Sequence, residues 1–371
     1  MTRARLTGRT LGRYHPIISS ATVPSVLGPV DGDALGFVLP HEHLTVDNRI
    51  HHAPRPGLPS DARVGVDTLG EVRVWPRALA DNIVLDDDTA VLADLRAYRA
   101  AGGRTLVEVT PIGMGRDLER LRRFAQASGV HVVASTAYYV QRGHGDRVAG
   151  RTAEHIAAEF IHDLTQGTPR CGMIGEIGIS AELHPDELTV LQAALLAQAA
   201  TGAPITIHVT TIRPVPALLD FLERSGRPLD RIVLGHMDYD LRTLAPHRRA
   251  LQLGLTVELD LFGYPAWTNE NFLHFPTDSQ RISALVQLAS EGFADQLLMS
   301  HDVCQKMQLT SRGGFGYAHI PAHVAALFEA LGAPTDLYHR LSVTTPRRLL
   351  CWDTSAATRR ATFRAYTSRR W

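Results

Sequence analysis

Six residues of types that commonly bind metal ions lie at or just after the ends of short apolar segments. Two of them form His41-x-His43, and alternate residues of an extended segment point to the same side, so both imidazoles face one way. The other four are Glu176, His208, His236 and Asp302. Four histidines and two carboxylates that meet in one place are able to bind two divalent ions, with Glu176 as a bridge. If the six were ordinary core or surface residues, they would fall at the ends of these segments only by chance.

The apolar segments that carry these residues alternate with helical patterns along the chain. The expected strands are 37–39, 105–109, 131–134, 173–177, 205–209, 232–234, 255–259 and 296–300. The expected helices are 86–101, 117–129, 152–164, 185–202, 214–225, 241–253, 278–292 and 319–332, followed by a short helix over 347–352. Eight strands alternating with helices predict an α/β fold of the (β/α)8 type, a TIM barrel. Active sites of such barrels lie at the C-terminal ends of the strands, where the six residues fall.

A doubly wound sheet is the competing architecture. It usually has a glycine-rich phosphate-binding turn after its first strand, whereas here the first strand leads into Pro40-His41-Glu42-His43. Strand alternation turns Glu42 away from the two histidines and into the barrel packing. The segment 45–85 predicts an extended loop at the C-terminal face of the strands, and loops of this length are usually functional or disordered. His51 and His52 within it could contact the site as part of a lid, but exposed loop residues are the preferred interpretation.

The composition excludes several classes of protein. The chain has 371 residues, with 38 Lys plus Arg and 38 Asp plus Glu, and this balance offers no electrostatic footprint for nucleic acid or an anionic membrane. No apolar run approaches the roughly 18 residues of a membrane span. The 3 cysteines are too few and too scattered for a disulfide scaffold. We expect a cytoplasmic protein with a loose leader over 1–24, one barrel domain over 25–353 and a basic tail over 354–371.

Longer motifs resemble the phosphotriesterase family of the amidohydrolase superfamily. The resemblance runs from Ser25 to Trp352 and rests on the segments 27–30, 39–44, 111–117, 174–178, 235–238, 300–302 and 313–319. By this resemblance, the more buried metal ion is held by His41, His43 and Asp302. The more exposed ion is held by His208 and His236, and Glu176 bridges the two ions.

Members of this family differ in the bridging residue. Many, including organophosphate-cleaving enzymes and related lactonases, use a carboxylated lysine, whereas this chain has Glu176. Its single lysine, Lys306, follows the eighth expected strand and does not match the bridging position. A glutamate there resembles the phosphotriesterase-related branch, which includes animal members that act on N-acetylated amino compounds. Lactonases of the family also tend to have Asp-Arg-Tyr after the seventh strand, and this chain has Asp260-Leu261-Phe262 instead.

We therefore expect a binuclear hydrolase that cleaves an amide or carboxylic ester bond of a small molecule, with phosphotriester hydrolysis at most incidental. A hydroxide between two divalent ions is the expected nucleophile, with Zn²⁺ as first choice and Mn²⁺, Co²⁺ or Fe²⁺ as alternatives. Asp302 is the expected acceptor of its proton. Tyr139 is expected either to stabilise the oxyanion or to form an aromatic wall. Two alternatives stay open: a lactonase or organophosphate hydrolase, and a metal-binding barrel without turnover that serves as a receptor or scaffold.

Aromatic residues of the later loops are candidates for a hydrophobic pocket over the metals: Phe262, Tyr264, Trp267 and Phe315. The family resemblance also implies a homodimer, and the balanced charge would let like chains associate without strong repulsion.

Overall fold

The computed structural model describes residues 21–59, 61–264 and 275–352. Its strands are β1 (Thr22–Ser25), β2 (Gly28–Asp31), β3 (Phe37–Glu42), β4 (Gly103–Glu108), β5 (His131–Thr136), β6 (Met173–Ile179), β7 (Ile205–Val209), β8 (Ile232–Leu234), β9 (Thr256–Leu259) and β10 (Leu297–Met299). Its α-helices are α1 (Val66–Val74), α2 (Asp88–Ala100), α3 (Leu118–Ser128), α4 (Ala153–Thr165), α5 (Pro185–Thr201), α6 (Val215–Arg224), α7 (Ala245–Gln252), α8 (Asp278–Leu288), α9 (Ala325–Ala330), α10 (Leu337–His339) and α11 (Thr345–Leu350). All eight strands predicted from the sequence are present as β3 to β10. No helix in these described segments is both long and apolar enough to cross a membrane.

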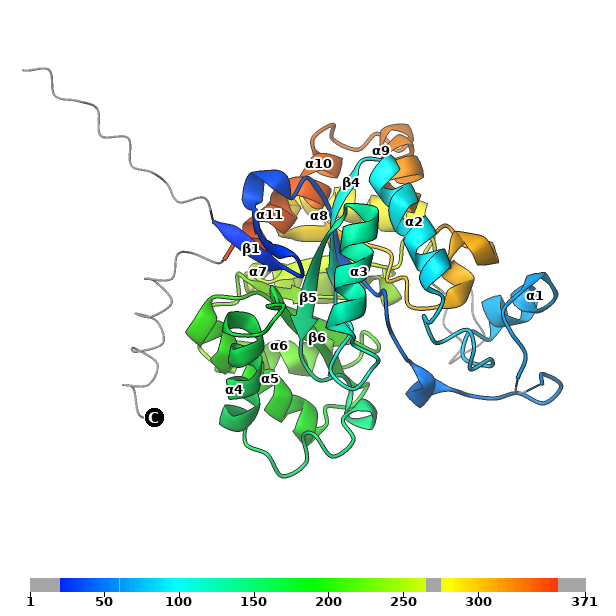
Figure 1. The fold of residues 1–371 in the computed structure, drawn as a ribbon. Coiled ribbons are helices and arrows are strands. Elements are labelled where there is room, and N and C mark those ends of the chain that lie inside the picture. The colour runs from blue at the N-terminus through cyan, green and yellow to red at the C-terminus, as the bar shows by residue number, and fades with distance from the viewer. Residues whose placement is uncertain (1–20, 60, 265–274, 353–371) are drawn as a thin grey trace, which may run out of the picture.

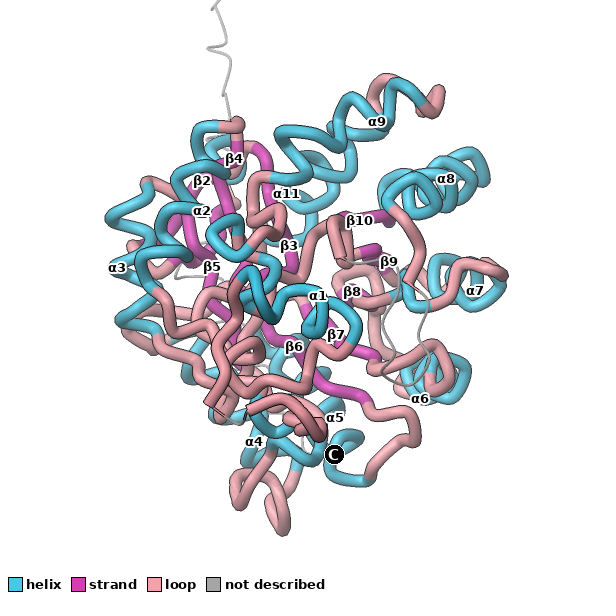
Figure 2. The backbone as a smooth tube through the Cα atoms, turned by 90° about the vertical axis from the view of Figure 1, so that its right-hand side faces the viewer, coloured by secondary structure: helices cyan, strands magenta, loops and turns pink. Residues whose placement is uncertain are grey.

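The strands β3 to β10 form one parallel sheet whose spatial order follows the chain. The sheet curls until β10 lies beside β3, so the barrel is nearly closed. Figure 2 shows the strands inside and the helices around them. Because both faces of such a sheet are covered, the strands are buried along almost their whole length. The predicted TIM barrel is confirmed.

The helices begin where the sequence provides side-chain caps. Asp87 accepts a hydrogen bond from the Ala90 backbone at the start of α2, and Asp117 does the same for Arg120 at the start of α3. Thr152 caps α4 in the same way. Each cap pairs a backbone N–H that has no partner inside its helix, and so fixes where the chain turns from loop to helix.

A β1–β2 hairpin, absent from the sequence prediction, packs against one end of the barrel. Val23 and Val30 of the hairpin share an apolar cluster with Val107 and Val133 of the barrel strands. The hairpin begins before the predicted domain boundary at residue 25, so the barrel fold includes the last residues of the predicted leader. Residues 1–20 of that leader and the predicted tail 354–371 lie outside the described residues. Figure 1 shows β1 and α1 on opposite sides of the molecule.

The long first loop contains a helix where the sequence predicts an extended loop. The sequence of α1 includes a glycine and several β-branched residues, which form helices poorly on their own. Tertiary contacts compensate, because Val72 packs with Val64, Leu79 and Met307. The Arg73 guanidinium also donates to the Gly313 carbonyl at 2.9 Å. The loop is thereby fixed against the loop that follows β10, which contains Met307 and Gly313.

Glu42 joins the first and last strands of the barrel. Its carboxylate accepts hydrogen bonds from the Ser300 hydroxyl and from the backbone N–H groups of His301 and Val303, at 2.8–2.9 Å. It also bonds Nδ1 of the His301 ring at 2.8 Å. The Glu42 side chain is fully buried and points away from His41 and His43, as strand alternation predicts. Side-chain bonds thus close the seam between β3 and β10.

We predict that Glu42→Gln lowers the free energy of unfolding by about 2–3 kcal/mol, because a buried charged acceptor with several donors becomes an amide with one acceptor oxygen. Chemical denaturation monitored by circular dichroism measures this change. Glu119→Gln on the exposed face of α3 is the matched control and should cost no more than about 0.5 kcal/mol. Equal losses in the two variants would contradict the role of Glu42 at the seam.

Candidate metal centre

The C-terminal ends of the barrel strands bring the six predicted metal ligands into one cluster. His41 lies in β3 and His43 directly follows it, while Glu176 and His208 lie within β6 and β7. His236 follows β8 and Asp302 follows β10. All six are buried from solvent except for a small part of Asp302.

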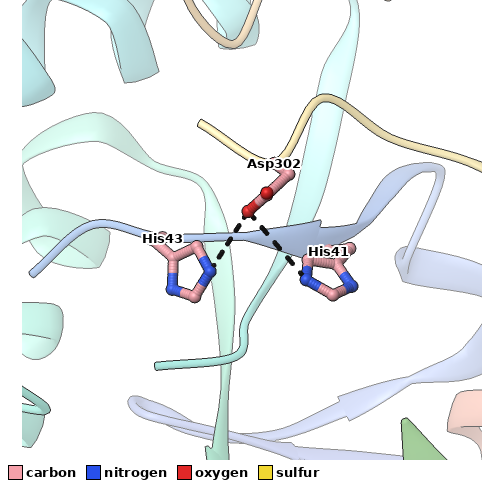
Figure 3. A group of neighbouring side chains, drawn as sticks. All are labelled: His41, His43 and Asp302. Atoms are coloured by element: carbon pink, nitrogen blue, oxygen red, sulfur yellow. Dashed lines mark ion pairs between the residues drawn. The ribbon is translucent and has the colours of Figure 1, made fainter. Parts of the chain in front are cut away.

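One group of ligand atoms consists of His41, His43 and Asp302 (Figure 3). The Asp302 Oδ1 atom lies 3.2 Å from His43 Nε2 and 4.0 Å from His41 Nε2. Two ligands bonded to one tetrahedral ion at about 2.1 Å each are roughly 3.4 Å apart. The three side chains are therefore already spaced as ligands of a single ion.

A second group consists of Glu176, His208 and His236. Glu176 Oε2 lies 2.9 Å from His208 Nδ1 and 3.8 Å from His236 Nε2. The two imidazoles approach each other to 2.6 Å between His208 Nδ1 and His236 Nε2, which is a hydrogen-bond distance. The two nitrogens must move apart by about 0.8 Å for both to bind one tetrahedral ion.

Glu176 lies between the two groups. Its Oε1 is 3.4 Å from His43 Nε2, and its Oε2 is 3.3 Å from His41 Nε2. The same carboxylate therefore faces all four histidines, two from each group. Glu176 is thus the residue that the two groups share.

Three further residues orient the imidazoles through the ring nitrogen that faces away from the cluster. His43 Nδ1 bonds the Thr110 hydroxyl at 2.8 Å, and that hydroxyl in turn donates to Glu108. His236 Nδ1 donates to Asp260 at 2.7 Å. His208 Nε2 lies 3.1 Å from the Tyr139 hydroxyl. Such partners fix the tautomer and the orientation of a metal-binding imidazole.

Two glycines allow this close packing. A Cβ atom on Gly178 of β6 would lie 2.0 Å from the Val140 nitrogen, so only glycine lets β6 approach the segment that carries Tyr139. A Cβ atom on Gly235 would lie 3.0 Å from Asp260 Oδ2, next to the His41 ring.

The structure also brings together a third group, His41, His236 and Asp260. Asp260 already accepts hydrogen bonds from both the backbone N–H and Nδ1 of His236. We therefore interpret Asp260 as a residue that orients His236, and not as a metal ligand.

Two of the six ligand residues have strained backbones. His236 has φ 55° and Asp302 has φ 51°, and they are the non-glycine residues with positive φ in the described part of the chain. Positive φ is costly for residues with a Cβ and persists where the surrounding structure enforces it, often at functional sites. His236 lies two residues after the end of β8 and Asp302 three residues after the end of β10, so both lie at the mouth of the barrel.

The cluster contains more carboxylates than fixed cations, and this shifts its pKa values. Burial opposes protonation of His41, but Asp260, Glu176 and Glu258 outweigh it and raise the pKa of the imidazole well above its ordinary value. Burial also opposes ionisation of Asp302, but the hydrogen bond with His43 and the nearby His236 and His41 lower its pKa to about 2. The raised pKa of His41 thus reflects the surrounding carboxylates, and the lowered pKa of Asp302 reflects the surrounding imidazoles.

The residues fit divalent ions on two further observations. Both ring nitrogens of the fully buried His41 lack a hydrogen-bond partner among the described residues. Nε2 instead faces the carboxylates of Glu176 and Asp302 at 3.3 and 4.0 Å, and since buried polar atoms are normally hydrogen-bonded, this arrangement indicates a position for a cation. The donor set of imidazole nitrogens and carboxylate oxygens is the one that zinc and similar transition metals prefer.

A cavity of about 250 Å³ opens above the cluster and is lined by His208, Asp302, Tyr139 and Tyr264, among others. Of the other predicted pocket residues, Phe262 is 1% exposed and belongs to the apolar core. Phe315 is 56% exposed, stacks on His319 and lines a neighbouring cavity. Trp267 lies outside the described residues. The two phenylalanines are therefore placed elsewhere than predicted, because aromatic type alone does not tell core packing from a cavity wall.

Several residues near the site carry roles that the sequence did not reveal. Asp260 and Thr110 orient ligands, and His51 and Arg77 line the cavity. The only sequence signal was the position of Asp260 and Thr110 just after strands.

Lys306 is bound by Asp81 and Asp86, at 2.6 Å each, and so is tied to the first loop.

The chain matches known proteins along most of its length. The sequence model of the phosphotriesterase family matches residues 21–350. An N-acetyltaurine hydrolase of Salmo salar is 34% identical over 345 residues, which cover 89% of this chain and 98% of the salmon protein. A phosphotriesterase-related protein of Aedes aegypti is 33% identical, over 89% of this chain and 99% of the mosquito protein.

Solved structures agree with these matches. The crystal structure of a resiniferatoxin-binding protein from Rhodobacter sphaeroides superposes with a TM-score of 0.85 at 33% identity, covering 89% of this chain and 95% of that one. The match along nearly the whole chain and the cluster of metal-ligand residues lead to one conclusion: this protein belongs to the phosphotriesterase family and is a metal-dependent hydrolase.

Proposed function

We propose that this chain is a binuclear hydrolase that cleaves the amide bond of a small N-acylated amino compound, with two Zn²⁺ ions as its cofactors. The observation that carries the proposal is the Glu176 carboxylate, which lies 2.9–3.8 Å from a nitrogen of each of the four histidines. His41, His43 and Asp302 would hold one ion, His208 and His236 the other, and Glu176 both.

When bound, the two ions supply an activated water at neutral pH and polarise the carbonyl oxygen of the substrate. Asp302 is the residue best placed to move the proton. Its Oδ1 faces the histidines, while its other oxygen lies 3.7 Å from Cys304 Sγ, which also lines the cavity. With the ions bound, the Asp302 carboxylate would accept a proton from the attacking water and pass it to the leaving amine.

Tyr139 acts on the site through His208. Burial, followed by the charge of Glu176, raises the pKa of Tyr139 well above its ordinary value, so its hydroxyl remains protonated. That hydroxyl meets His208 Nε2 at 3.1 Å and holds the ring with Nδ1 toward Glu176. We propose a positioning role for Tyr139, in place of direct stabilisation of an oxyanion.

A proton on Asp302 could move outward through His301 or through His236, and the two histidines differ in their hydrogen bonds. His301 bonds Glu42 through Nδ1 and accepts from the Ile320 backbone through Nε2, so both ring nitrogens are engaged away from the cavity. His236 bonds Asp260 on its outer side. A proton relay outward therefore favours His236 and Asp260.

Two observations favour an amide substrate over a lactone, and the size of the cavity favours a small molecule of either kind. Relatives at 31–34% identity include N-acetyltaurine hydrolases from several vertebrates. After β9 the chain has Leu261 where the lactonases of the family tend to have an arginine. The cavity of about 250 Å³ is small beside the roughly 300–1,000 Å³ of pockets for drug-sized ligands, and so fits a small substrate. The homodimer and the cytoplasmic location expected from the sequence stay predictions.

We predict that Glu176→Gln reduces the bound metal from about two ions per chain to about one, and lowers kcat at least about 100-fold, because a neutral amide bridges two cations poorly. Elemental analysis and steady-state kinetics measure the two effects. Glu187→Gln removes another buried carboxylate, one that accepts from Ser180 and Gln141 on the α5 side of the barrel. That control should retain its metal and its activity. Unchanged metal content in Glu176→Gln would reject the bridge.

We also predict that metal-free protein recovers full activity with divalent metal alone. Glu176 is already a carboxylate, so no carbon dioxide is needed to build the bridge. The rate of recovery is measured after chelation, with and without added bicarbonate. A clear bicarbonate requirement would show that a carboxylated lysine forms the bridge, and this chain has only Lys306 to provide it.

A substrate panel tests the reaction class. We expect the zinc-loaded chain to hydrolyse N-acetylated amino compounds with a kcat/KM at least about tenfold above that for simple lactones and phosphotriesters. Release of acetate and of the free amine is followed by chromatography. Preferential hydrolysis of lactones or phosphotriesters would contradict the proposed activity and support a lactonase or organophosphate hydrolase. No hydrolysis of any substrate would support a metal-binding barrel without turnover.

A further inference from the structure

One imidazole of the cluster, that of His41, is not oriented by a hydrogen bond. The rings of His43, His208 and His236 each form one through the nitrogen that faces away from the cluster. The corresponding nitrogen of the fully buried His41, Nδ1, has no hydrogen-bond partner among the described residues. A neutral imidazole that binds an ion through Nε2 carries its proton on Nδ1. A buried N–H group of this kind requires an acceptor.

Two buried carboxylates approach His41 Nδ1. Glu258 Oε2 lies at 3.3 Å and Asp260 Oδ2 at 3.4 Å. Asp260 is already engaged, because it accepts from the backbone N–H of His236 and bonds Nδ1 of that ring. Glu258 belongs to β9 and is fully buried, and neither of its carboxylate oxygens has a hydrogen-bond partner among the described residues. Glu258 is therefore the carboxylate that remains available to His41.

We propose that Glu258 is a positioning residue for His41, because it accepts a hydrogen bond from Nδ1 and so directs Nε2 at the more buried ion. This inference rests on the metal centre of the proposed function and adds the residue that orients one of its ligands. A carboxylate behind a metal-binding imidazole fixes the tautomer and increases the basicity of the ligand. The low dielectric of a buried site makes such a hydrogen bond stronger than it would be in water.

Strand β9 then serves both ions. Alternate residues of an extended segment point to the same side, so Glu258 and Asp260 both face the cluster. Asp260 orients His236, a ligand of the more exposed ion. Glu258 orients His41, a ligand of the more buried ion. A change at Glu258 should therefore weaken the more buried ion and leave the other ion nearly unaffected.

Zinc titration of metal-free protein, followed by calorimetry, tests this separation. In a His208→Ala background, which lacks a ligand of the more exposed ion, Glu258→Leu should raise the Kd of zinc at the more buried position about 10- to 100-fold. Glu258→Gln keeps the size and one acceptor oxygen, so its effect should be smaller than that of Glu258→Leu. In a His43→Ala background, which lacks a ligand of the more buried ion, Glu258→Leu should change the Kd of the remaining zinc by less than about threefold.

The stability of the metal-free protein separates this role from a structural one. A buried carboxylate without a hydrogen-bond donor is unfavourable, so neither Glu258 variant should lower the midpoint of chemical denaturation in the absence of metal. Glu187→Gln is the matched control, because Glu187 is also fully buried but accepts from Ser180 and Gln141. The control should lower the denaturation midpoint and leave both zinc affinities unchanged.

An unchanged zinc affinity in Glu258→Leu would overturn the inference. Equal losses in the two backgrounds, or a loss that accompanies a lower stability of the metal-free protein, would overturn it as well. If the wild type binds zinc and shows the expected dependence on Glu258 but hydrolyses no amide, the proposed function fails and the inference stands. A wild type that binds no zinc would overturn both.

Discussion

The organisation of the site depends on one buried carboxylate that faces four imidazoles. Glu176 lies 2.9–3.8 Å from a nitrogen of each histidine, and a position fully removed from water makes any unbalanced charge costly. The carboxylates around the imidazoles, Asp260 first and Glu176 after it, outweigh burial and raise the pKa values of His41 and His236. Divalent ions would take the place of protons on these nitrogens when they bind. The surrounding structure serves to keep these groups at this separation.

The barrel holds that separation by using every strand end. β3 carries His41, β6 carries Glu176, and the other strands supply either a ligand or a residue that orients one, such as Thr110 after β4 and Asp260 after β9. Asp302 follows β10, so its distance from the first ligands depends on the closure of the seam by Glu42. The stability of the seam and the geometry of the metal centre are therefore linked. Glu42 itself does not contact the ring nitrogens of the four histidines in the cluster.

The sequence predicted the barrel and the six candidate ligands, because ligand residues at the ends of apolar strands are recognisable without coordinates. It could not predict the orienting roles of Thr110 and Asp260, which depend on distances between strands. The helix α1 was not predicted, because its own sequence forms helices poorly and tertiary contacts with Met307 and Leu79 stabilise it. Phe262 was assigned to the pocket although it packs in the core, since a pattern of aromatic residues does not give side-chain direction. For the same reason the place of Arg77 in the cavity wall was not predicted.

Anomalous X-ray diffraction from crystals of the zinc-loaded protein, measured on both sides of the zinc absorption edge, tests the central claim most directly. The account predicts two anomalous peaks per chain, one contacted by His41, His43 and Asp302 and the other by His208 and His236, with one oxygen of Glu176 bound to each ion. A single peak, or two peaks of which one lacks Glu176 as a ligand, would contradict it.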